Sequence, residues 1–307
     1  MRLDDHRAEI EERLDGVPAL AGRPRTVEEL PGGLTNLNLK VTTPDGTYVV
    51  RHFHGDGTLL GIDRDAEHLN TRAAAEAGVG AAVVDYRPDL SMLVIGYIDG
   101  FTYDNATFAR PGVVERVAAA VRTLHAGPRF TTDFDMFARQ AAYRRTVHDK
   151  GYPLFDGYDE HAAAFRRVRA ALAVNDEGTV PCNNDLLAGN FVDDGDKLWL
   201  IDYEYAGNND ACFELGNTAT ECDLTGDQVE ELVTAYYGRR LRNKIARARL
   251  QALVSAYGWS LWGAIQAAAS TLDFDFDGWG RERYGKAVAG FTGHRFDELI
   301  AEVQRDD

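Results

Sequence analysis

The start of the chain alternates hydrophobic and polar positions in the way that a pleated strand requires. In the stretch NLNLKV the apolar residues Leu37, Leu39 and Val41 would share one face of such a strand. The next stretch, TPDG at 43–46, is a typical turn sequence, and TYVVRHF at 47–53 can return as the partner strand. This pattern predicts an antiparallel hairpin.

A helix and two further strands are predicted after the hairpin. Residues 63–78 begin with acidic side chains, which favour a helix N-terminus, and end on Gly78, which favours a helix stop. Short apolar runs at 81–86 and 91–98 follow as strands. With a charged, helix-periodic arm of about 20 residues before the hairpin, the order β-β-α-β-β predicts an antiparallel sheet with one helix.

The rest of the chain is dominated by helical periodicity. Residues 111–127 and 159–174 are amphipathic, and the chain is helical again from about residue 226. We therefore predict an α+β protein with the two-lobed architecture of the protein-kinase fold. A small antiparallel β-sheet lobe with one helix would occupy residues 1–98, and a larger, mainly helical lobe would occupy residues 99–307.

One short hairpin in the second lobe carries acidic and amide side chains at its open end. The apolar runs at 191–192 and 198–201 are joined by the turn-forming sequence DDGDK. Asn190 and Asp202 are equally far from residue 196, so a hairpin centred there would place them opposite each other, about 5 Å apart. We expect their oxygens to converge on one point.

An amide oxygen and a carboxylate that converge form a site that suits Mg²⁺. Asp185, five residues before Asn190, would lie beside this ion and could orient a hydroxyl group for attack, as phosphoryl transfer requires. The alternative is that these side chains only cap turns. The joint pattern D-x₄-N-x₁₁-D, with its second Asp at the end of a buried strand, favours phosphoryl transfer.

Composition and charge narrow the choice of partners and compartment. The chain has 307 residues, is 45% hydrophobic and carries a net charge of −16 at pH 7, which argues against a nucleic-acid partner. It contains no run of eighteen apolar residues and no signal-peptide core, so we expect no integral membrane association. Three cysteines without paired spacing favour a reducing cytoplasm. An acidic surface that reflects a high-salt host is a further hypothesis, and an oligomer stays possible.

The Asp-rich segment resembles the catalytic core of the choline/ethanolamine kinase family, within the aminoglycoside-phosphotransferase branch of the protein-kinase fold. That family carries H-N-D-x-x-x-x-N, a hairpin, and then [LI]-I-D-[FY]-E-Y-[AS]. This chain reads NNDLLAGN from residue 183 and LIDYEYA from residue 200. A further run, FELGN at 213–217 with Glu221 after it, resembles the family's F-[DE]-[IL]-G-N followed by Glu. The resemblance extends over about residues 28–290.

The resemblance implies a role for each of these residues. Asp185 would be the catalytic base, and Asn190 and Asp202 would hold Mg²⁺. In the first lobe, GGLTN at 32–36 resembles the family's G-G-x-[ST]-N loop over the phosphates of ATP, and its glycines would let backbone N–H groups approach phosphate. The residues of this loop that we assign to the nucleotide are Gly32, Gly33, Thr35 and Asn36.

Two charged residues are predicted to support the nucleotide from the sheet and its helix. Arg51 occupies the position of the phosphate-contacting cation in kinase-like sheets, and Glu67 on the following helix would pair with it. Taken alone, the two could be unrelated surface charges. Residues 94–98 fall where the connector between the lobes would contact adenine. The run G-x-x-x-x-G-K-[ST] is absent from the chain, so a P-loop kinase is not expected.

Three of the four tryptophans fall between residues 255 and 284, where the family's acceptor site would lie. Trp259 and Trp262 would share one helix face, and Trp279 would follow a chain bend at Asp277–Gly278. Aromatic faces with a nearby carboxylate recognise a quaternary ammonium, although aromatic residues at helical spacing also serve as core. The resemblance, which includes the W-x-x-W-x-x-x-Q motif and a later Arg, implies a cation site formed by Trp259, Trp262, Trp279, Glu221 and Glu204.

These patterns predict an ATP- and Mg²⁺-dependent kinase with a small amino alcohol as acceptor, choline being favoured. Ethanolamine and an aminoglycoside are the alternative acceptors. A primary ammonium such as that of ethanolamine gains more from carboxylates than from indoles, which distinguishes it from choline. The residues after Glu221 differ from those of the eukaryotic enzymes, so one wall of the cation site would either be missing or come from elsewhere. Asn183 stands where the family has a loop-bracing His; its amide keeps some donor and acceptor capacity with less bulk, so we expect weakened but retained activity. A pseudokinase that binds nucleotide or choline without turnover is the alternative from another class.

Overall fold

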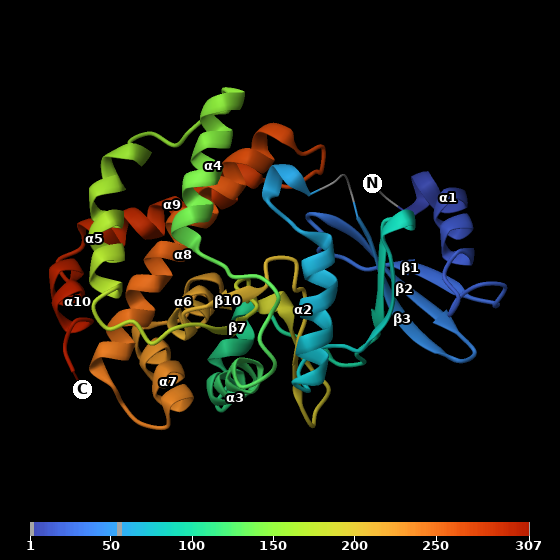
Figure 1. Cartoon of the computed structure of the whole chain (residues 1–307), viewed down its shortest axis with the longest axis horizontal. Coiled ribbons are helices and arrows are strands. Elements are labelled where there is room, and N and C mark those ends of the chain that lie inside the picture. Colours follow the sequence, from blue (N-terminus) through green and yellow to red (C-terminus); the bar gives the residue numbers. More distant parts are fainter. Residues whose placement is uncertain (1–2, 54–56, 307) are drawn as a thin grey trace.

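The computed structural model describes residues 3–53 and 57–306. In Figure 1 the strands of the first lobe lie on the right and the helices of the second lobe on the left, with α2 between them. The helices are α1 (Leu3–Asp15), α2 (Arg64–Glu76), α3 (Val113–His125), α4 (Met136–Lys150), α5 (Ala162–Leu172), α6 (Ala211–Glu221), α7 (Gly226–Tyr237), α8 (Arg242–Ala269), α9 (Phe276–Thr292) and α10 (Phe296–Glu302). The strands are β1 (Thr26–Glu29), β2 (Asn36–Thr43), β3 (Gly46–Phe53), β4 (Val83–Arg87), β5 (Met92–Gly96), β6 (Phe101–Thr102), β7 (Val180–Cys182), β8 (Phe191–Asp193), β9 (Leu198–Leu200) and β10 (Gly207–Asn209).

The first lobe is built on a five-stranded antiparallel sheet with the order β1-β2-β3-β5-β4. The predicted hairpin is confirmed, with Thr43 opposite Gly46 at the turn and Leu39 opposite Val50 in the buried part. The edge strand β1 escaped prediction because its sequence, TVEE, holds a single apolar residue and no alternation. The two-lobed, kinase-like fold that the sequence predicts is confirmed.

Helix α2 joins the sheet to the second lobe. The side chain of Asp63 caps its first turn by accepting from the N–H of Ala66, and Gly78 follows its end at a φ of 85°. Its buried face carries polar side chains, among them Asn70, whose Nδ2 donates to the carbonyl of Ala206 at 2.9 Å. The helix that positions Glu67 is therefore attached to the segment that follows Asp202.

The second lobe surrounds the long helix α8, whose sides are buried against α4, α6 and α9. Within residues 3–53 and 57–306, no helix is long and apolar enough to cross a membrane. The sheet of the first lobe ends with β5 at Gly96, and β6 already pairs with β8 of the second lobe. The division of the chain at residues 98 and 99 stays a prediction.

The predicted register of the Asp-rich hairpin is wrong by one residue. Phe191 lies opposite Leu200, so Asn190 faces Ile201, whose N–H donates to the Asn190 carbonyl at 3.0 Å. Asp202 is the next residue along, and its φ of 66° is in the left-handed region that non-glycine residues rarely adopt. The strand pairing is centred between residues 195 and 196 and not on residue 196, and Asp202 lies beyond the paired residues.

Helices α8 and α9 cross where both carry glycine. A Cβ on Gly263 would lie 2.7 Å from the Cα of Gly280, so neither position has room for a side chain. This close approach brings together the preceding residues, Trp262 and Trp279, with ring centroids 5.1 Å apart. The chain bend before Trp279 lies earlier than predicted, because Asp275 caps α9 and the pair at 277–278 is already helical.

Candidate active site

Two cavities meet at Asp202, between the sheet and the second lobe. The first, which we call the sheet cavity, has a volume of about 300 Å³. The second, the tryptophan cavity, has a volume of about 110 Å³. Lining residues of the sheet cavity include Leu30, Asn38, Arg51, Ala81, Ile95, Gly96, Tyr97, Ile98, Ile201 and Asp202. The tryptophan cavity is lined by Gly32, Leu34, Thr35, Asp185, Leu187, Asn190, Asp202, Glu204, Tyr205, Trp259, Trp262 and Trp279.

The residues predicted for the nucleotide do not share one space, because Gly32 and Thr35 line the tryptophan cavity and Arg51 lines the sheet cavity. Arg51 and four residues of the predicted connector, Ile95 to Ile98, face the sheet cavity, whereas Asp185, Asn190 and the three tryptophans face the tryptophan cavity. Asp202 lines both. The two cavities therefore adjoin at Asp202.

The loop that carries Asp185 is held in place by Glu214 of α6. This carboxylate is buried, and its two oxygens accept the backbone N–H groups of Asn183 and Asn184, each at 2.7 Å. Asn184 has a φ of 68°, and its amide donates to three carbonyls, including that of Tyr205 at 3.1 Å. Charge-assisted bonds of this kind are the stronger ones, so the loop is rigidly placed.

Asn183 braces the loop in the way that the sequence predicts for this position. Its buried Nδ2 donates to the carbonyls of Ile201 and Asp202, at 3.1 and 2.8 Å, and its Oδ1 accepts the N–H of Asp185 at 3.1 Å. One amide therefore ties the backbone of Asp185 to the backbone of Asp202. These are the two residues whose mutual placement the proposed chemistry needs.

Replacing Asn183 with Ala is expected to lower turnover by about 10–100-fold, the usual effect of losing an outer partner of a reactive group. The Michaelis constant for the nucleotide should change less than turnover, because Asn183 does not itself line the sheet cavity and contacts only the backbone of Ile201 and Asp202 there. Steady-state kinetics with varied nucleotide and acceptor measure this split. Asn183→His is the matched control, for which we expect turnover to be unchanged or modestly raised; an Ala variant with wild-type turnover would contradict the bracing role.

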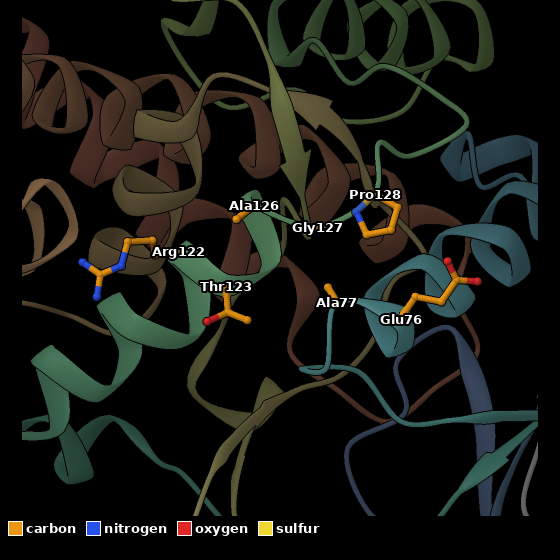
Figure 2. A pocket seen from close by; sticks show the side chains of 7 residues that line it. All are labelled: Glu76, Ala77, Arg122, Thr123, Ala126, Gly127 and Pro128. Atoms are coloured by element: carbon orange, nitrogen blue, oxygen red, sulfur yellow. The ribbon is translucent and has the colours of Figure 1, made fainter.

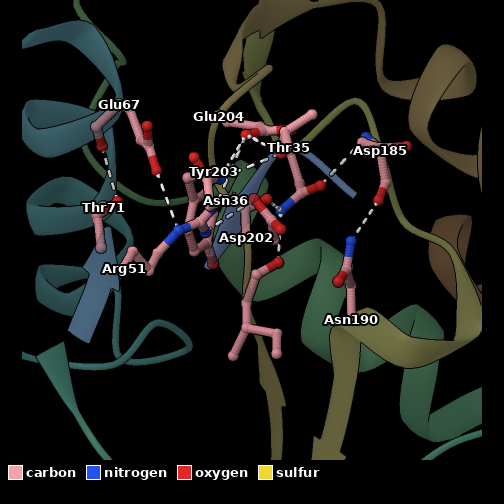
Figure 3. A network of polar contacts seen from close by, with 12 residues as sticks. Thr35, Asn36, Arg51, Glu67, Thr71, Asp185, Asn190, Asp202, Tyr203 and Glu204 are labelled. Carbon is pink, nitrogen blue, oxygen red and sulfur yellow. Dashed lines mark hydrogen bonds and ion pairs between the residues drawn. The ribbon is translucent and has the colours of Figure 1, made fainter. Parts of the chain in front are cut away.

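Asn190 and Asp202 each retain an oxygen for a ligand. The Nδ2 of Asn190 donates to the carbonyl of Asp185 at 2.7 Å (Figure 3). This bond orients the amide and leaves its Oδ1 available to a ligand. One oxygen of Asp202 accepts from Arg51 at 2.8 Å. Both side chains line the tryptophan cavity. An amide and a carboxylate oxygen of this kind are the ligands that a hard cation prefers.

Arg51 lies at the centre of a buried acidic cluster (Figure 3). Its guanidinium contacts Asp202 at 2.8 Å, Glu67 at 3.4 Å and Glu204 at 3.5 Å, and 5% of the residue is exposed. Burial by itself would lower the pKa of Arg51, but the three neighbouring carboxylates outweigh it and raise this pKa above its ordinary value. The guanidinium therefore stays charged. The predicted contact between Arg51 and Glu67 is present, together with two partners that the sequence did not indicate.

Arg64, at the start of α2, is a residue that the sequence reading missed. It donates to Glu67 at 2.7 Å and to the side-chain oxygen of Asn36 at 2.8 Å, and it stacks 4.3 Å from the ring centre of Phe53. Its spacing of three residues before Glu67 is typical of a helical ion pair and could have indicated it. It gives the cluster a second cation.

Glu204, which was predicted to attract the cation of the acceptor, lies at the border of the two lobes and contacts residues of the first lobe. Its carboxylate accepts from the hydroxyl of Thr35 at 2.9 Å and from the amide of Asn36 at 3.0 Å, and it contacts Arg51 and Arg64 at 3.5 and 3.4 Å. Burial and the adjacent Asp202 raise the pKa of Glu204 to about 7, against the opposing effect of Arg51. Its oxygens are taken up by donors of the first lobe.

The second carboxylate that was predicted for the cation, Glu221, is also occupied. It forms a buried ion pair with Arg283, in which Nε donates to Oε1 at 3.1 Å. The guanidinium of Arg283 lies 3.4 Å from the ring centre of Trp279. Glu221 is absent from the lining of the tryptophan cavity, so it acts on that space through Arg283 and the indole.

Aromatic faces form one side of the tryptophan cavity. The rings of Tyr205 and Trp259 lie 4.7 Å apart at 66°, and Trp262 donates its indole N–H to the hydroxyl of Tyr205 at 2.9 Å. Trp259 is buried, and within the described part of the chain its Nε1 has no hydrogen-bond partner. Tyr205 is a further lining residue; it belongs to the motif at 200–206, and the sequence predicts no role for it.

Asp185 has an unusual electrostatic environment. Burial raises the pKa of its carboxyl well above the ordinary range, and the nearby charges of Glu221, Asp202 and Glu204 act in the same direction. Strongly shifted groups that face a cavity are frequent at functional sites. An acid that binds protons more readily than usual is suited to accept one from a substrate hydroxyl.

A larger, open hollow lies away from these residues. It has a volume of about 690 Å³ and lies between the ends of α2 and α3, where Glu76, Ala77, Arg122 and Pro128 line it (Figure 2). None of the predicted site residues is among its lining. The chemistry therefore belongs to the two cavities at Asp202.

An antiparallel sheet over a helical lobe, with this site between them, defines a phosphotransferase of the kinase-like class. Comparison with known proteins agrees, because the model of the phosphotransferase enzyme family matches residues 26–253. A choline/ethanolamine kinase family protein from Mesorhizobium loti is 31% identical to this chain, with a TM-score of 0.85 over 97% of this chain and 99% of its own. The chain therefore belongs to the choline/ethanolamine kinase family of phosphotransferases, which act on alcohol groups.

Other relatives are more distant. A probable ethanolamine kinase of Arabidopsis thaliana is 25% identical over 294 residues, which cover 85% of this chain and 78% of that protein. The chain spans about two thirds (66%) of ethanolamine kinase 2 of Rattus norvegicus, at 26% identity. The choline kinase LicA of Streptococcus pneumoniae has the same fold, with a TM-score of 0.79 at 24% identity over 94% of this chain and all of its own.

Proposed function

We propose that this protein is an ATP- and Mg²⁺-dependent kinase that transfers the γ-phosphate to the hydroxyl of choline. One observation carries the choice of acceptor. Aromatic rings line the cavity beside Asp185, whereas the two carboxylates expected to attract a cation are already paired, Glu204 with donors of the first lobe and Glu221 with Arg283. A quaternary ammonium binds to aromatic faces without needing hydrogen-bond acceptors.

The sheet cavity supports a nucleotide as the donor. It is apolar at Ala81, Ile95 and Ile98 and carries Arg51 and Asp202 at its inner end, as an adenine and a phosphate chain would require. A structure of LicA in complex with AMP has a TM-score of 0.75 with this chain at 24% identity. A nucleotide donor, together with cysteines that are buried and free among the described residues, supports a cytoplasmic protein.

The residues at Asp202 fit a magnesium ion. The side-chain oxygen of Asn190 and the second oxygen of Asp202 are available hard ligands, and Mg²⁺ commonly takes few protein ligands in addition to phosphate oxygens. When bound there, the ion would neutralise phosphate charge. Asp185 orients the acceptor hydroxyl and receives its proton, while Arg51 stays charged beside the phosphates because three carboxylates surround it.

The size of the tryptophan cavity supports a small acceptor. A volume of about 110 Å³ is below the 300–1,000 Å³ of sites for drug-sized ligands, which disfavours an aminoglycoside. Ethanolamine is the second candidate, since several curated relatives at about 25% identity are named ethanolamine kinases. A primary ammonium needs hydrogen-bond acceptors, and the free oxygens of the tryptophan cavity, on Asp185, Asn190 and Asp202, are those that we assign to the acceptor hydroxyl and the metal ion.

Replacing Trp279 with Leu should distinguish the two acceptors. Loss of one desolvated cation–π contact, worth about 2 kcal/mol, should raise the Michaelis constant for choline by roughly 30-fold. The constant for ethanolamine should rise much less. Release of ADP over choline, ethanolamine and its methylated derivatives measures both.

The matched variant is Trp279→Phe, which keeps a ring under Arg283 and should retain most of the choline preference. An equal loss for both acceptors in Trp279→Leu would contradict the cation–π site. Absence of ADP release with every amino alcohol, combined with nucleotide-induced thermal stabilisation, would favour the pseudokinase alternative.

A further inference from the structure

The glycine loop of the first lobe, residues 32–36, reaches across the lobe border to the acceptor side. Gly32, Leu34 and Thr35 line the tryptophan cavity, although the loop belongs to the sheet that bears the predicted nucleotide residues. The side chain of Leu34 packs against the core of the second lobe, and Leu34 and Trp279 both line the tryptophan cavity. This loop therefore contributes a wall to the space in which we place the acceptor.

Two residues of the second lobe, Glu204 and Gln266, hold the loop in this position. The hydroxyl of Thr35 donates to the carboxylate of Glu204 at 2.9 Å, and the amide of Asn36 donates to the same group at 3.0 Å. On the other side, Nε2 of Gln266 on α8 donates to the carbonyl of Leu34 at 3.4 Å. Both acceptor and donor on the second lobe are buried, and a buried group that loses its partner is destabilised.

The backbone of the loop has little freedom to adopt another closed form. Gly32 has a φ of 94°, and a Cβ on Gly33 would lie 2.2 Å from the carbonyl oxygen of Asn36. Arg64 fixes the end of the loop by donating to the side-chain oxygen of Asn36 at 2.8 Å. The loop is thus either docked as it stands or released at Thr35 and Leu34.

We propose that residues 32–36 form a movable wall of the acceptor cavity, in which Leu34 limits the size of the acceptor's cationic head and Glu204 is a positioning residue that keeps the wall closed. The proposal rests on the proposed function for the identity of the acceptor. This proposal extends the proposed function, because it assigns the selection of the acceptor to Leu34, a residue of the first lobe. Leu30 and Pro31, which directly precede the loop, line the sheet cavity, so a movement of the loop would be transmitted along the chain to the nucleotide side.

The first test enlarges the cavity with Leu34→Ala. The acceptors are choline and its triethyl analogue, in which each N-methyl group is replaced by N-ethyl. A hydrophobic pocket discriminates by about 10–200-fold per methylene, so the ratio of kcat/KM for the triethyl analogue over choline should rise at least tenfold. Leu30→Ala is the matched control, because Leu30 lines the sheet cavity only and should leave that ratio unchanged. An unchanged ratio in Leu34→Ala would overturn the role of Leu34.

The second test releases the loop with a nearly isosteric change at the residue that contacts Glu204. Thr35→Val removes the hydroxyl that Glu204 accepts, and Thr35→Ser retains it. Hydrogen–deuterium exchange of the backbone N–H groups of residues 32–36 should accelerate at least tenfold in the Val variant and stay near wild type in the Ser variant. The Michaelis constant for the acceptor should rise in parallel, with the maximal rate at saturating choline less affected. Equal exchange in the two variants would overturn the closing contact.

The two tests separate this proposal from the proposed function. If wild type phosphorylates choline but Leu34→Ala keeps its selectivity, the kinase assignment stands and the role of the loop falls. If wild type phosphorylates no amino alcohol, the acceptor assignment falls. The exchange experiment, which needs no turnover, then decides by itself whether Glu204 holds the loop closed.

Discussion

Replacing Asp185 with Asn is expected to reduce phosphoryl transfer by about 10²–10⁴-fold, the range of a lost general base, and to make the ligand-free protein more stable. The stabilisation follows from the pKa of the Asp185 carboxyl, which burial and three neighbouring carboxylates raise well above the usual value. At neutral pH the charged form therefore disfavours the folded state, and the neutral amide removes this penalty.

The pH dependence gives the sign of the effect. A group with a raised pKa in the folded protein stabilises it below its unfolded-state pKa, here about 4, and this contribution is lost as the pH rises through the folded-state value. The melting temperature of Asp185→Asn should therefore equal that of wild type near pH 4 and exceed it by roughly 2–4 °C at pH 8, which corresponds to about 1 kcal/mol. Thermal unfolding without nucleotide measures the difference. A variant that is inactive but less stable than wild type at pH 8 would refute this account of the carboxylate.

Replacing Arg51 with Ala should have the largest effect on stability. It would leave Glu67, Asp202 and Glu204 without the cation between them, and breaking a buried ion pair from one side costs about 3–5 kcal/mol. Nucleotide binding should fall with it, since Arg51 also lines the sheet cavity. Urea unfolding measures the free energy of unfolding, and fluorescence titration measures nucleotide affinity.

Two variants make this test specific. Arg51→Lys keeps the charge but loses the planar fork that contacts three partners, so its stability should lie between those of wild type and Arg51→Ala. Arg144→Ala removes an exposed pair with Asp159 and should change the free energy of unfolding by less than about 1 kcal/mol. Similar losses in Arg51→Ala and Arg144→Ala would show that the acidic cluster does not depend on Arg51.

The elements of the fold were largely predictable, because their patterns are local. The hairpin of β2 and β3, the span of α2 and the short strands β8 and β9 follow from alternation, capping residues and turn sequences. The edge strand β1 and the register of the Asp-rich hairpin did not follow. A strand with one apolar residue has no periodic signal, and a turn that ends in a left-handed Asp cannot be counted by symmetry.

The candidate site was predictable in membership and less so in contacts. Asp185, Asn190, Asp202 and the three tryptophans line one cavity, as their motifs indicate. The partners of the carboxylates were not foreseen. Glu204 lies 169 positions from Thr35, and Glu221 lies 62 positions from Arg283. Periodicity relates neighbours three or four residues apart, whereas such distant pairs depend on how whole lobes pack.

By itself the sequence determined which side chains this protein brings to its reaction, because helix faces, hairpins and short motifs are set by neighbours along the chain. Only the tertiary structure decided how those side chains are used. Packing of the sheet against the second lobe commits Glu204 to Thr35 and Asn36, and Glu221 is paired with Arg283, so neither of the two carboxylates predicted for the cation is free beside the indoles. Charge pairing across a lobe border is a property of the packed molecule, and no stretch of the chain contains it.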